Sequence, residues 1–268
     1  MVSSLHFHKL GHGPNILLAF HGIGQEGASC FKPFEDNLGK YYTIYAFDLF
    51  FHGQSHLPEE RHAFSEPEPI TKAIWKDVIQ GFLTKNQISR FDVAGFSMGG
   101  RFVLATLEAF SDKIDNAFLI APDGISKHPL YSFATGFAPA RRLFRRCMKH
   151  PKTFFRAVKY LENTGIINQS LQRFTQHVLN TPEKRQTVFN SWIAFRPLQF
   201  DIPKLYAKTQ ADHVELFLFI GKYDKLLPPK AVKKLSDLMP EQYYQILQSG
   251  HGSLVHKVAT LLSEKYIA

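Results

Sequence analysis

The sequence predicts an α/β fold in which a mostly parallel central sheet is flanked by helices and carries an inserted helical cap. Three observations predict it. Short apolar runs alternate with amphipathic helical patterns in the first half of the chain, which is typical of consecutive βαβ units. The same alternation returns near the C-terminus, and residues 124–197 between the two parts contain no pattern of a buried strand. We therefore expect a core formed by residues 1–123 and 198–268 and a cap formed by residues 124–197.

Six apolar runs are expected to be the strands of the core. Runs of this length, bounded by polar or turn-forming residues, are typical of buried strands. They cover residues 15–20 (NILLAF), 42–48 (YTIYAFD), 90–96 (RFDVAGF), 116–122 (NAFLIAP), 214–221 (VELFLFIG) and 243–248 (YYQILQ).

Amphipathic patterns between these runs predict the helices. In residues 69–83, apolar side chains recur four apart at Ile70, Ile74, Val78 and Phe82, which places them on one helical face. Further helices are expected directly after Ser97, near residues 229–239 and from about residue 253. In the cap, Thr181-Pro182-Glu183 has the N-cap, first-turn proline and first-turn acid of a helix that runs towards Phe195.

Composition limits the class of protein. A chain of 268 residues with 44% hydrophobic and 21% charged residues can bury one sizeable core, and none of its apolar runs approaches the roughly 20 residues that span a bilayer. The first residues, MVSSLHFHKLGHG, lack the basic flank and apolar core of a secretory signal, so we expect a cytoplasmic location. Cys30 and Cys147 have no metal-binding spacing, and we expect both to be reduced and structural, with no metal and no cofactor.

The glycine-rich loop at residues 22–27 has two interpretations. Gly22, Gly24 and Gly27 fit the G-x-G-x-x-G pattern of a dinucleotide-binding loop, and Asp48 follows 21 residues after Gly27, near the position of the acid that binds a ribose hydroxyl. That loop needs a helix that begins within the glycines. Pro33 disfavours such a helix, and we expect a short helix that starts only near Pro33 and ends by residue 39. The nucleotide interpretation is therefore disfavoured.

A second motif follows the strand at residues 90–96. Gly95-Phe-Ser97-Met-Gly99 is a G-x-S-x-G sequence between a predicted strand and a predicted helix. This context places the serine on a tight turn with its hydroxyl exposed. A serine hydroxyl becomes a nucleophile only when a base accepts its proton and a third group orients that base.

Two residues downstream can complete such a set. Asp224 stands just past one predicted strand and His251 just past the next. Asp123, which also follows a strand, is an alternative acid, and Asp224 has the alternative role of capping the following helix. We prefer Asp224 because its strand neighbours the one that precedes His251. Among 13 histidines we prefer His251 over His256, which falls on the last predicted helix.

The Ser, Asp, His order and the G-x-S-x-G elbow resemble those of the α/β-hydrolase superfamily. The resemblance covers residues from about 12 to 123 and 198 to 268, and that fold carries its lids at the position of residues 124–197. It implies that Ser97 is the nucleophile, His251 the general base and acid, and Asp224 the orienting acid. It further implies an oxyanion hole formed by the backbone N–H groups of Ile23 and Met98.

One segment departs from the pattern of the superfamily. Many members have D-x-x-G-x-G-x-S after the fourth strand, whereas residues 48–55 read DLFFHGQS, with Phe51 at the first glycine. This difference leaves the shape of the loop open. It does not affect the triad.

The resemblance implies a serine hydrolase that cleaves carboxylic esters, or related acyl bonds, through an acyl-enzyme intermediate. The same triad also serves C–C bond hydrolysis or acyl transfer, and a hydrolase fold can serve as a ligand-binding receptor. If Ile23 supplies an oxyanion donor, Ile23→Pro is expected to depress turnover far more than Gly27→Ala.

The positive charge of the chain is concentrated in the expected cap. Residues 124–197 contain 13 Lys and Arg against the two acids Glu162 and Glu183, a net charge of +11, whereas the remainder carries −2. In residues 139–149, and again in residues 152–161, basic positions form one helical face and apolar positions another. Such helices bind anionic membrane surfaces or guide an anionic, lipid-like acyl substrate; the alternative is the solvated face of a lid. No nucleic-acid-binding module is present, and we expect no such partner.

Overall fold

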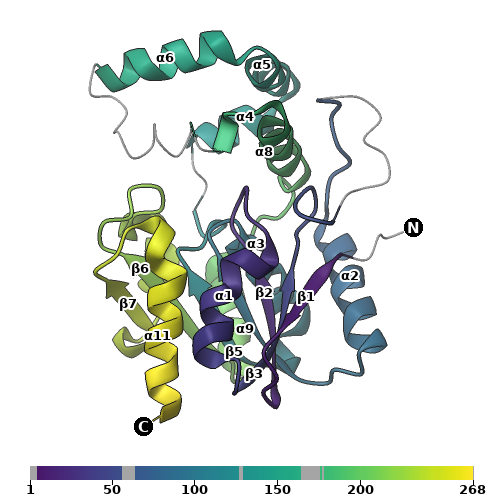
Figure 1. Cartoon of the computed structure of the whole chain (residues 1–268), viewed down its shortest axis with the longest axis vertical. Coiled ribbons are helices and arrows are strands. Elements are labelled where there is room, and N and C mark those ends of the chain that lie inside the picture. Colours follow the sequence, from purple (N-terminus) through teal and green to yellow (C-terminus); the bar gives the residue numbers. More distant parts are fainter. Residues whose placement is uncertain (1–4, 56–63, 127–128, 164–175, 177, 268) are drawn as a thin grey trace. The chain divides into compact units, whose positions relative to one another are not determined.

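The computed structural model describes residues 5–55, 64–126, 129–163, 176 and 178–267 (Figure 1). The chain divides into two compact units. The core unit comprises Met1–His56, Thr71–Ser126 and Leu198–Ala268, and the cap unit comprises Leu57–Ile70 and Lys127–Pro197. The sequence did not predict that residues before Thr71 group with the cap unit.

Three contacts explain this grouping. The Ile70 N–H donates to the carbonyl of Ala194 at 2.8 Å, and the Phe64 N–H donates to the side-chain amide oxygen of Gln186 at 2.6 Å. The Phe64 ring also packs edge-on against Phe189, with a centroid distance of 5.9 Å. A helix of the cap unit therefore holds this connecting segment.

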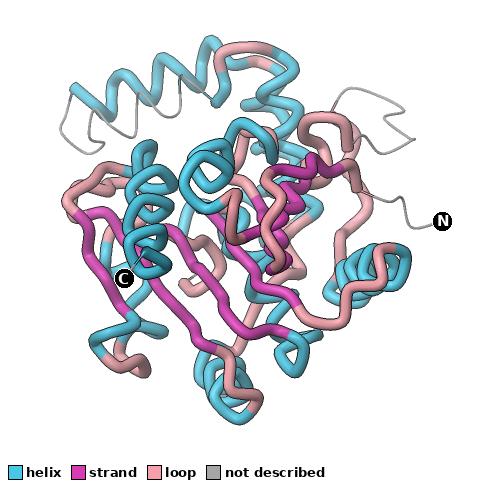
Figure 2. Tube along the Cα trace, turned by 60° about the horizontal axis from the view of Figure 1, so that its bottom comes forward, coloured by secondary structure: helices cyan, strands magenta, loops and turns pink. Residues whose placement is uncertain are grey.

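Seven strands form one sheet in the core unit, in the order β1-β3-β2-β4-β5-β6-β7. All neighbouring strands are parallel except β1 and β3, which are antiparallel. The magenta strands of Figure 2 run side by side in this sheet. The strands are β1 (Phe7–Leu10), β2 (Asn15–Phe20), β3 (Tyr42–Phe47), β4 (Phe91–Phe96), β5 (Ile114–Ile120), β6 (Glu215–Gly221) and β7 (Tyr244–Leu247).

The predicted α/β class with a mostly parallel sheet is confirmed. Every residue of β3 and β4 is buried, as expected for central strands covered on both faces. The six predicted strands are present, within one to two residues of their expected ends. The edge strand β1 was not predicted, because its four residues, FHKL, are half polar and form no apolar run.

Helices flank the sheet (Figure 1). Helices α1 and α11 pack against each other, and α3 packs against both α2 and α9. Helix α9 was not predicted, although Asp201 caps its first turn by accepting the Lys204 N–H at 3.2 Å. The helices are α1 (Gly27–Leu38), α2 (Lys72–Lys85), α3 (Gly99–Phe110), α9 (Ile202–Ala211), α10 (Lys233–Ser236) and α11 (Leu254–Ile267).

The prediction for the first helix was wrong. Helix α1 begins at Gly27, and Pro33 lies inside it, whereas the sequence predicted a helix that starts only near Pro33. An internal proline removes one backbone hydrogen bond and costs about 3 kcal/mol. Burial of the apolar face offsets this cost, because Cys30, Phe31, Phe34 and Leu38 are all at least 95% buried. Tertiary packing therefore overrides the local signal of the proline.

The cap unit is helical, and its described residues contain no strand. Its helices are α4 (Pro129–Gly136), α5 (Ala138–Lys149), α6 (Pro151–Asn163) and α8 (Pro182–Ala194). The start of α8 is confirmed: the Thr181 hydroxyl accepts the Lys184 N–H at 3.3 Å, and Pro182 is the first helical residue. No helix in the described part of the chain is long and apolar enough to cross a membrane.

The basic face of α5 is divided. Glu66 accepts a hydrogen bond from the Arg141 Nε at 2.7 Å and lies 3.7 Å from Arg145. Arg142, Arg146 and Lys149 remain exposed. The predicted single basic face of residues 139–149 is therefore partly an internal contact of the cap unit.

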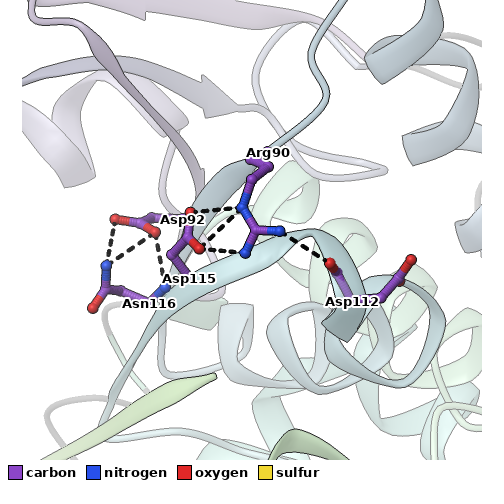
Figure 3. A network of polar contacts seen from close by, with 5 residues as sticks. All are labelled: Arg90, Asp92, Asp112, Asp115 and Asn116. Atoms are coloured by element: carbon purple, nitrogen blue, oxygen red, sulfur yellow. Dashed lines mark hydrogen bonds and ion pairs between the residues drawn. The ribbon is translucent and has the colours of Figure 1, made fainter. Parts of the chain in front are cut away.

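A polar network joins β4 and β5 near the ends at which these strands begin (Figure 3). The buried carboxylate of Asp92 accepts the backbone N–H of Asn116 at 2.8 Å and the Tyr42 hydroxyl at 2.6 Å, and burial raises the pKa of Asp92. Arg90 forms a two-pronged contact with Asp115. The carboxyl ends of parallel strands lie at the opposite edge of the sheet, so this network aligns the strands and belongs to no site at that edge.

Candidate active site

Ser97 follows the last residue of β4, on a turn that only a strained backbone can make. Its φ angle is 53°, a left-handed conformation that costs a non-glycine residue roughly 1–2 kcal/mol. Three backbone hydrogen bonds hold it there. The Ser97 N–H donates to Ile120 O at 2.9 Å, and the Ser97 carbonyl accepts the N–H groups of Gly100 at 2.9 Å and Asp123 at 2.8 Å. Strain of this kind concentrates at functional sites.

The glycines around Ser97 are required by close packing. A Cβ atom on Gly95 would lie 2.5 Å from Val103 and 2.6 Å from the carbonyl of Gly99, and one on Gly99 would lie 2.0 Å from the carbonyl of Phe20. Real Cβ atoms essentially never approach other atoms within 3.0 Å, so a side chain at either position would force its neighbours to shift. The turn is therefore closed tightly on itself and on the end of β2, as the G-x-S-x-G motif predicts.

Asp224 and His251 are brought together at the carboxyl ends of β6 and β7. The His251 Nδ1 lies 2.6 Å from the Asp224 Oδ2. The Asp224 carboxylate is fully buried, and its Oδ1 accepts the N–H groups of Leu226 and Leu227, both at 2.9 Å. These two bonds fix the carboxylate, which in turn fixes the imidazole through Nδ1. The Nε2 atom is then the nitrogen available to accept a proton.

The loops that follow β6 and β7 are bonded to each other. The Lys222 N–H donates to Leu247 O at 2.8 Å and the Tyr223 N–H to Ser249 O at 3.0 Å. A Cβ atom on Gly221 would lie 2.5 Å from the same Ser249 carbonyl. This close approach explains why two residues 27 positions apart in the sequence meet.

His251 also contacts the segment that carries the serine. Its ring lies 4.8 Å, centroid to centroid, from the ring of Phe96, the residue before Ser97. Ser97 itself is partly exposed. Within the described residues no hydrogen bond joins the Ser97 Oγ to His251, so the structure shows the bonded Asp224 and His251 as neighbours of the turn that carries Ser97.

The rival residues occupy other positions. Asp123 bonds to the Nε of Arg101 at 2.6 Å through Oδ2 and to the Gly124 N–H at 2.8 Å through Oδ1. His256 is exposed on α11. Of the two candidate acids, therefore, Asp224 is the one bonded to a histidine, and it accepts backbone N–H groups from a loop rather than from a helix.

The loop that carries Ile23 lies beside the elbow. Strands β2 and β4 are neighbours with Phe20 opposite Gly95, so the loops that leave them emerge together. A Cβ atom on Gly22 would lie 3.1 Å from the ring of Phe96. In the described part of the chain, neither the Ile23 N–H nor the Met98 N–H has a hydrogen-bond acceptor. Both are free to donate to a ligand, as the oxyanion prediction requires.

Asp48, the acid of the disfavoured nucleotide interpretation, is a structural residue. It is 1% exposed, and its carboxylate accepts the N–H groups of Gly27 at 2.8 Å and Gln54 at 2.9 Å. It thereby holds the start of α1, whose first N–H is not available to a phosphate. Pro33 does not break the helix, so it gives no reason against the nucleotide interpretation. The contacts of Asp48 do, because they occupy the N–H at the start of α1.

One cluster of side chains has the composition of a metal site. His6, His8 and Asp48 each place a donor atom within 4.8 Å of the others. The His8 Nε2 lies 3.2 Å from the Asp48 Oδ2, an oxygen that already accepts the Gln54 N–H. Backbone N–H groups therefore donate to both oxygens of the carboxylate, and the Gly27 donor places the cluster beside the start of α1.

In the segment DLFFHGQS, residues 48–55, a phenylalanine adopts the left-handed backbone conformation that glycine usually adopts. Phe51 has a φ angle of 69° and is 5% exposed. Burial of its ring offsets the cost of the left-handed backbone. The loop shape that the sequence left open is therefore one in which Phe51 adopts the conformation that a glycine would favour.

Two buried histidines that the sequence did not single out, His21 and His52, lie in the loops that follow β2 and β3. His21 is 0% and His52 4% exposed, and their rings meet edge to face at a centroid distance of 4.9 Å. Burial lowers the pKa of His21 to about 3 and that of His52 to about 4. Their positions in HGIG and FFHG were visible in the sequence, but nothing in the sequence showed that the two side chains meet. Cys30 is also buried, which raises the pKa of its thiol to about 12, as expected for a structural cysteine.

These two pKa values predict a loss of stability in mild acid. In the unfolded chain both rings titrate near pH 6.5, so below that pH the unfolded state binds more protons than the folded state. Their stabilising contribution is therefore complete above pH 6.5 and is lost as the pH falls towards 4. Between pH 7 and 5.5 each ring should lower the free energy of unfolding by about 1 kcal/mol.

Urea unfolding at both pH values measures this loss. In His52→Gln, whose side chain cannot titrate, the free energy of unfolding should fall by only about half as much between pH 7 and 5.5. His256→Gln, at an exposed position, should show the same fall as wild type. An equal acid sensitivity of all three proteins would contradict the assignment.

The sequence of this chain is similar to a known family and to a few curated proteins. Residues 15–257 match the family described as "alpha/beta hydrolase fold". Among curated proteins, an uncharacterised protein of Mycobacterium tuberculosis is 28% identical over 121 residues, and one of Mycobacterium bovis matches to the same degree. The matched segment is 45% of this chain and 33% of each relative. The chain therefore spans about a third of the length of these relatives.

Solved structures are similar over nearly the whole chain. A thermophilic esterase from Thermogutta terrifontis is 16% identical with a TM-score of 0.68, covering 98% of this chain and 93% of that one. An enol-lactonase from Burkholderia xenovorans has 16% identity and a TM-score of 0.66, with 98% and 95% coverage. A meta-cleavage product hydrolase from Pseudomonas fluorescens has 17% identity and a TM-score of 0.60, with 98% and 94% coverage. At these identities the similarity establishes the fold.

Proposed function

This chain belongs to the α/β hydrolase fold family, and we propose that it is a serine hydrolase that cleaves carboxylic esters. The observation that carries the proposal is the Asp224–His251 bond of 2.6 Å at the sheet edge where Ser97 stands on a strained turn. A buried acid that orients an imidazole beside a partly exposed serine is the arrangement that serine hydrolases need.

Each residue has a defined task in the proposed reaction. The Ser97 Oγ attacks the acyl carbon while the His251 Nε2 takes its proton, and Asp224 stabilises the imidazolium through Nδ1. The oxygen of the tetrahedral intermediate accepts hydrogen bonds from the N–H groups of Ile23 and Met98. His251 then protonates the leaving alcohol. Water, activated by the same imidazole, releases the acid from the acyl-enzyme. The residues named here require no cofactor.

A substrate panel tests this proposal. Solved structures similar to this chain include an esterase, an enol-lactonase and a meta-cleavage product hydrolase. The panel therefore contains p-nitrophenyl esters of graded acyl length, a thioester, a lactone and a vinylogous diketone. We expect turnover of the esters, with an optimum in acyl length. Turnover of the diketone alone would replace the ester assignment by C–C bond hydrolysis.

The cap unit supplies the second part of the proposal, which concerns the substrate's charge. Six cations of α5 and α6 are exposed in the described residues: Arg142, Arg146, Lys149, Lys152, Arg156 and Lys159. We propose that they attract an anionic, lipid-like acyl substrate, and that an anionic membrane surface is a further partner. A cytoplasmic location is proposed with it, supported by the two free cysteines.

The salt dependence of kcat/KM tests whether the exposed cations of the cap unit attract substrate or only face solvent. If the cations attract substrate, kcat/KM for a carboxylated ester should fall several-fold between 20 and 300 mM salt, because salt screens exposed charges. The neutral analogue of the same ester should change little. An identical salt dependence of the two esters would rule out electrostatic attraction by the cap unit.

Ile23→Pro tests the proposed oxyanion donor. Proline lacks the N–H, and loss of one such donor lowers kcat by about 10² to 10³. Ile23→Ala is the matched control, because it removes the side chain and keeps the donor, and its kcat should stay within about tenfold of wild type. Equal losses in the two variants, measured on a p-nitrophenyl ester, would contradict the role of the N–H.

The structure rules out the control that the sequence suggested. A Cβ atom on Gly27 would lie 2.5 Å from the carbonyl oxygen of Ala46 and 2.8 Å from that of Phe47. Gly27→Ala would therefore push α1 away from β3. Its effect on turnover would report a packing defect, so Ile23→Ala replaces it.

A further inference from the structure

The buried pair His21 and His52 has no task in the reaction proposed above, yet both rings bond to the loop that presents Ile23. His21 directly follows β2, and His52 lies in the loop after β3. The two rings touch each other. Each therefore connects two loops that leave neighbouring strands on the same edge of the sheet.

The bonds of His21 determine which of its nitrogens carries the proton. The Nε2 accepts the backbone N–H of Leu49 at 3.0 Å. Since a neutral imidazole has one donor and one acceptor, the proton is on Nδ1, which donates to the carbonyl of Gly22 at 2.7 Å. The ring therefore holds the Gly22 carbonyl.

His52 has the same tautomer and holds the next peptide group. Its Nε2 accepts the backbone N–H of Gly24 at 3.1 Å, and its Nδ1 donates to the carbonyl of Phe50 at 2.9 Å. Gly24 has a φ angle of 71°, a left-handed conformation that glycine adopts without penalty. Both rings need to be neutral for these bonds, and their burial keeps them so.

The geometry of the peptide bond links these contacts to the donor at Ile23. The carbonyl of Gly22 and the N–H of Ile23 belong to one planar trans peptide group, in which they point in opposite directions. A bond that fixes the carbonyl therefore fixes the N–H. His21 holds this group on one side of Ile23, and His52 holds the Gly24 N–H on the other.

We propose that His21 and His52 are positioning residues that aim the Ile23 N–H at the oxyanion. The proposal rests on the proposed function, because it assigns the pair a role in that reaction. The pair acts through the backbone. In the described residues neither ring bonds to Ser97, Asp224 or His251.

Two variants of His52 separate positioning from packing. His52→Phe keeps a ring of similar shape but has no acceptor for the Gly24 N–H, whereas the side-chain oxygen of His52→Gln reaches the place of Nε2. Because the oxyanion forms only during reaction, we expect His52→Phe to lower kcat about 10²-fold with KM within about twofold. We expect His52→Gln to restore kcat to within about tenfold of wild type. His256→Gln, exposed on α11, controls for loss of a histidine as such.

A double variant tests whether the pair acts through the Ile23 N–H. In Ile23→Pro, where that N–H is absent, adding His52→Phe should lower kcat by less than about threefold. Full additivity of the two losses would overturn the proposal, because independent effects add. Equal kcat values for His52→Phe and His52→Gln in folded protein would overturn it too.

A readout that needs no activity keeps the test separate from the proposed function. In the amide spectrum of ¹⁵N,²H-labelled protein, the Ile23 signal should coincide in wild type and His52→Gln and should shift or broaden in His52→Phe. An unchanged Ile23 signal in folded His52→Phe would overturn the proposal. Absence of ester hydrolysis by the wild type would instead refute the proposed function, and the amide spectra would still decide whether the pair orients Ile23.

Discussion

Ser97→Ala should lower kcat on a p-nitrophenyl ester by about 10⁵- to 10⁶-fold, the loss expected when a triad nucleophile is removed. The methyl group has no lone pair to attack the acyl carbon, and no other hydroxyl occupies this turn. Steady-state kinetics with a sensitive chromogenic ester measure the loss. Ser236→Ala, on α10, is the matched control and should keep wild-type kcat.

Stability measurements separate this loss from misfolding. Ser97 has a φ angle of 53°, a conformation that glycine adopts without penalty. Ser97→Gly should therefore be as inactive as Ser97→Ala and more stable than wild type, by about 1 kcal/mol. An inactive variant that is more stable cannot owe its inactivity to unfolding. Residual kcat within tenfold of wild type in both variants would remove Ser97 from the reaction.

The second large effect is expected at Asp224. In Asp224→Asn the side-chain oxygen should stay with the N–H groups of Leu226 and Leu227, which now bond to Oδ1. The NH₂ group then faces the His251 Nδ1 and forces the imidazole proton onto Nε2. A base that already carries its proton cannot accept another, so kcat should fall about 10⁴-fold.

Asp123→Asn is the comparison that decides between the two acids. Asp123 bonds to Arg101, so its amide variant should weaken that ion pair and leave kcat within about tenfold of wild type. The measurements are kcat of both variants on a p-nitrophenyl ester and the pH profile of kcat/KM. A larger loss in Asp123→Asn than in Asp224→Asn would show that the acid has been assigned to the wrong residue.

The sequence predicted most of the core because its strands are buried on both faces. A continuous apolar run such as residues 42–47 is visible without knowledge of its neighbours, and so is the strand, turn and helix around Ser97. Edge strand β1 escaped prediction because it is short and half polar. The start of helix α1 was predicted too late, because the helix is stabilised by burial against other elements, whereas the sequence near Pro33 shows only the local cost of the proline.

The candidate site divides in the same way. Ser97, Asp224 and His251 were predictable because each stands at a strand end, where parallel strands deliver side chains to a common edge. Asp224 was preferred over Asp123 because its strand neighbours the one that precedes His251, and the structure adds their contacts: Asp224 bonds to His251, whereas Asp123 bonds to Arg101. His21 and His52 were out of reach, because their importance lies in hydrogen bonds to backbone atoms 28 residues away.

The glycine-rich segment HGIGQEG shows how local patterns mislead. Its spacing fits a phosphate-binding loop, its helix begins where that loop requires, and an acid follows at a suitable distance. Yet Asp48 is bonded to the first N–H of α1, and in the described residues the N–H of Ile23 has no acceptor. The proposed function assigns the same backbone to a charge that exists only in a transition state.

The most direct test of the central claim is labelling with a fluorophosphonate, followed by intact-mass and peptide mass spectrometry. We predict one adduct per folded chain, located on Ser97, and labelling that slows by several orders of magnitude in His251→Ala. Heat-denatured protein should not be labelled, because the triad exists only in the folded chain. Absence of an adduct on folded wild-type protein, or an adduct on a serine other than Ser97, would contradict the assignment of this chain as a serine hydrolase acting through Ser97.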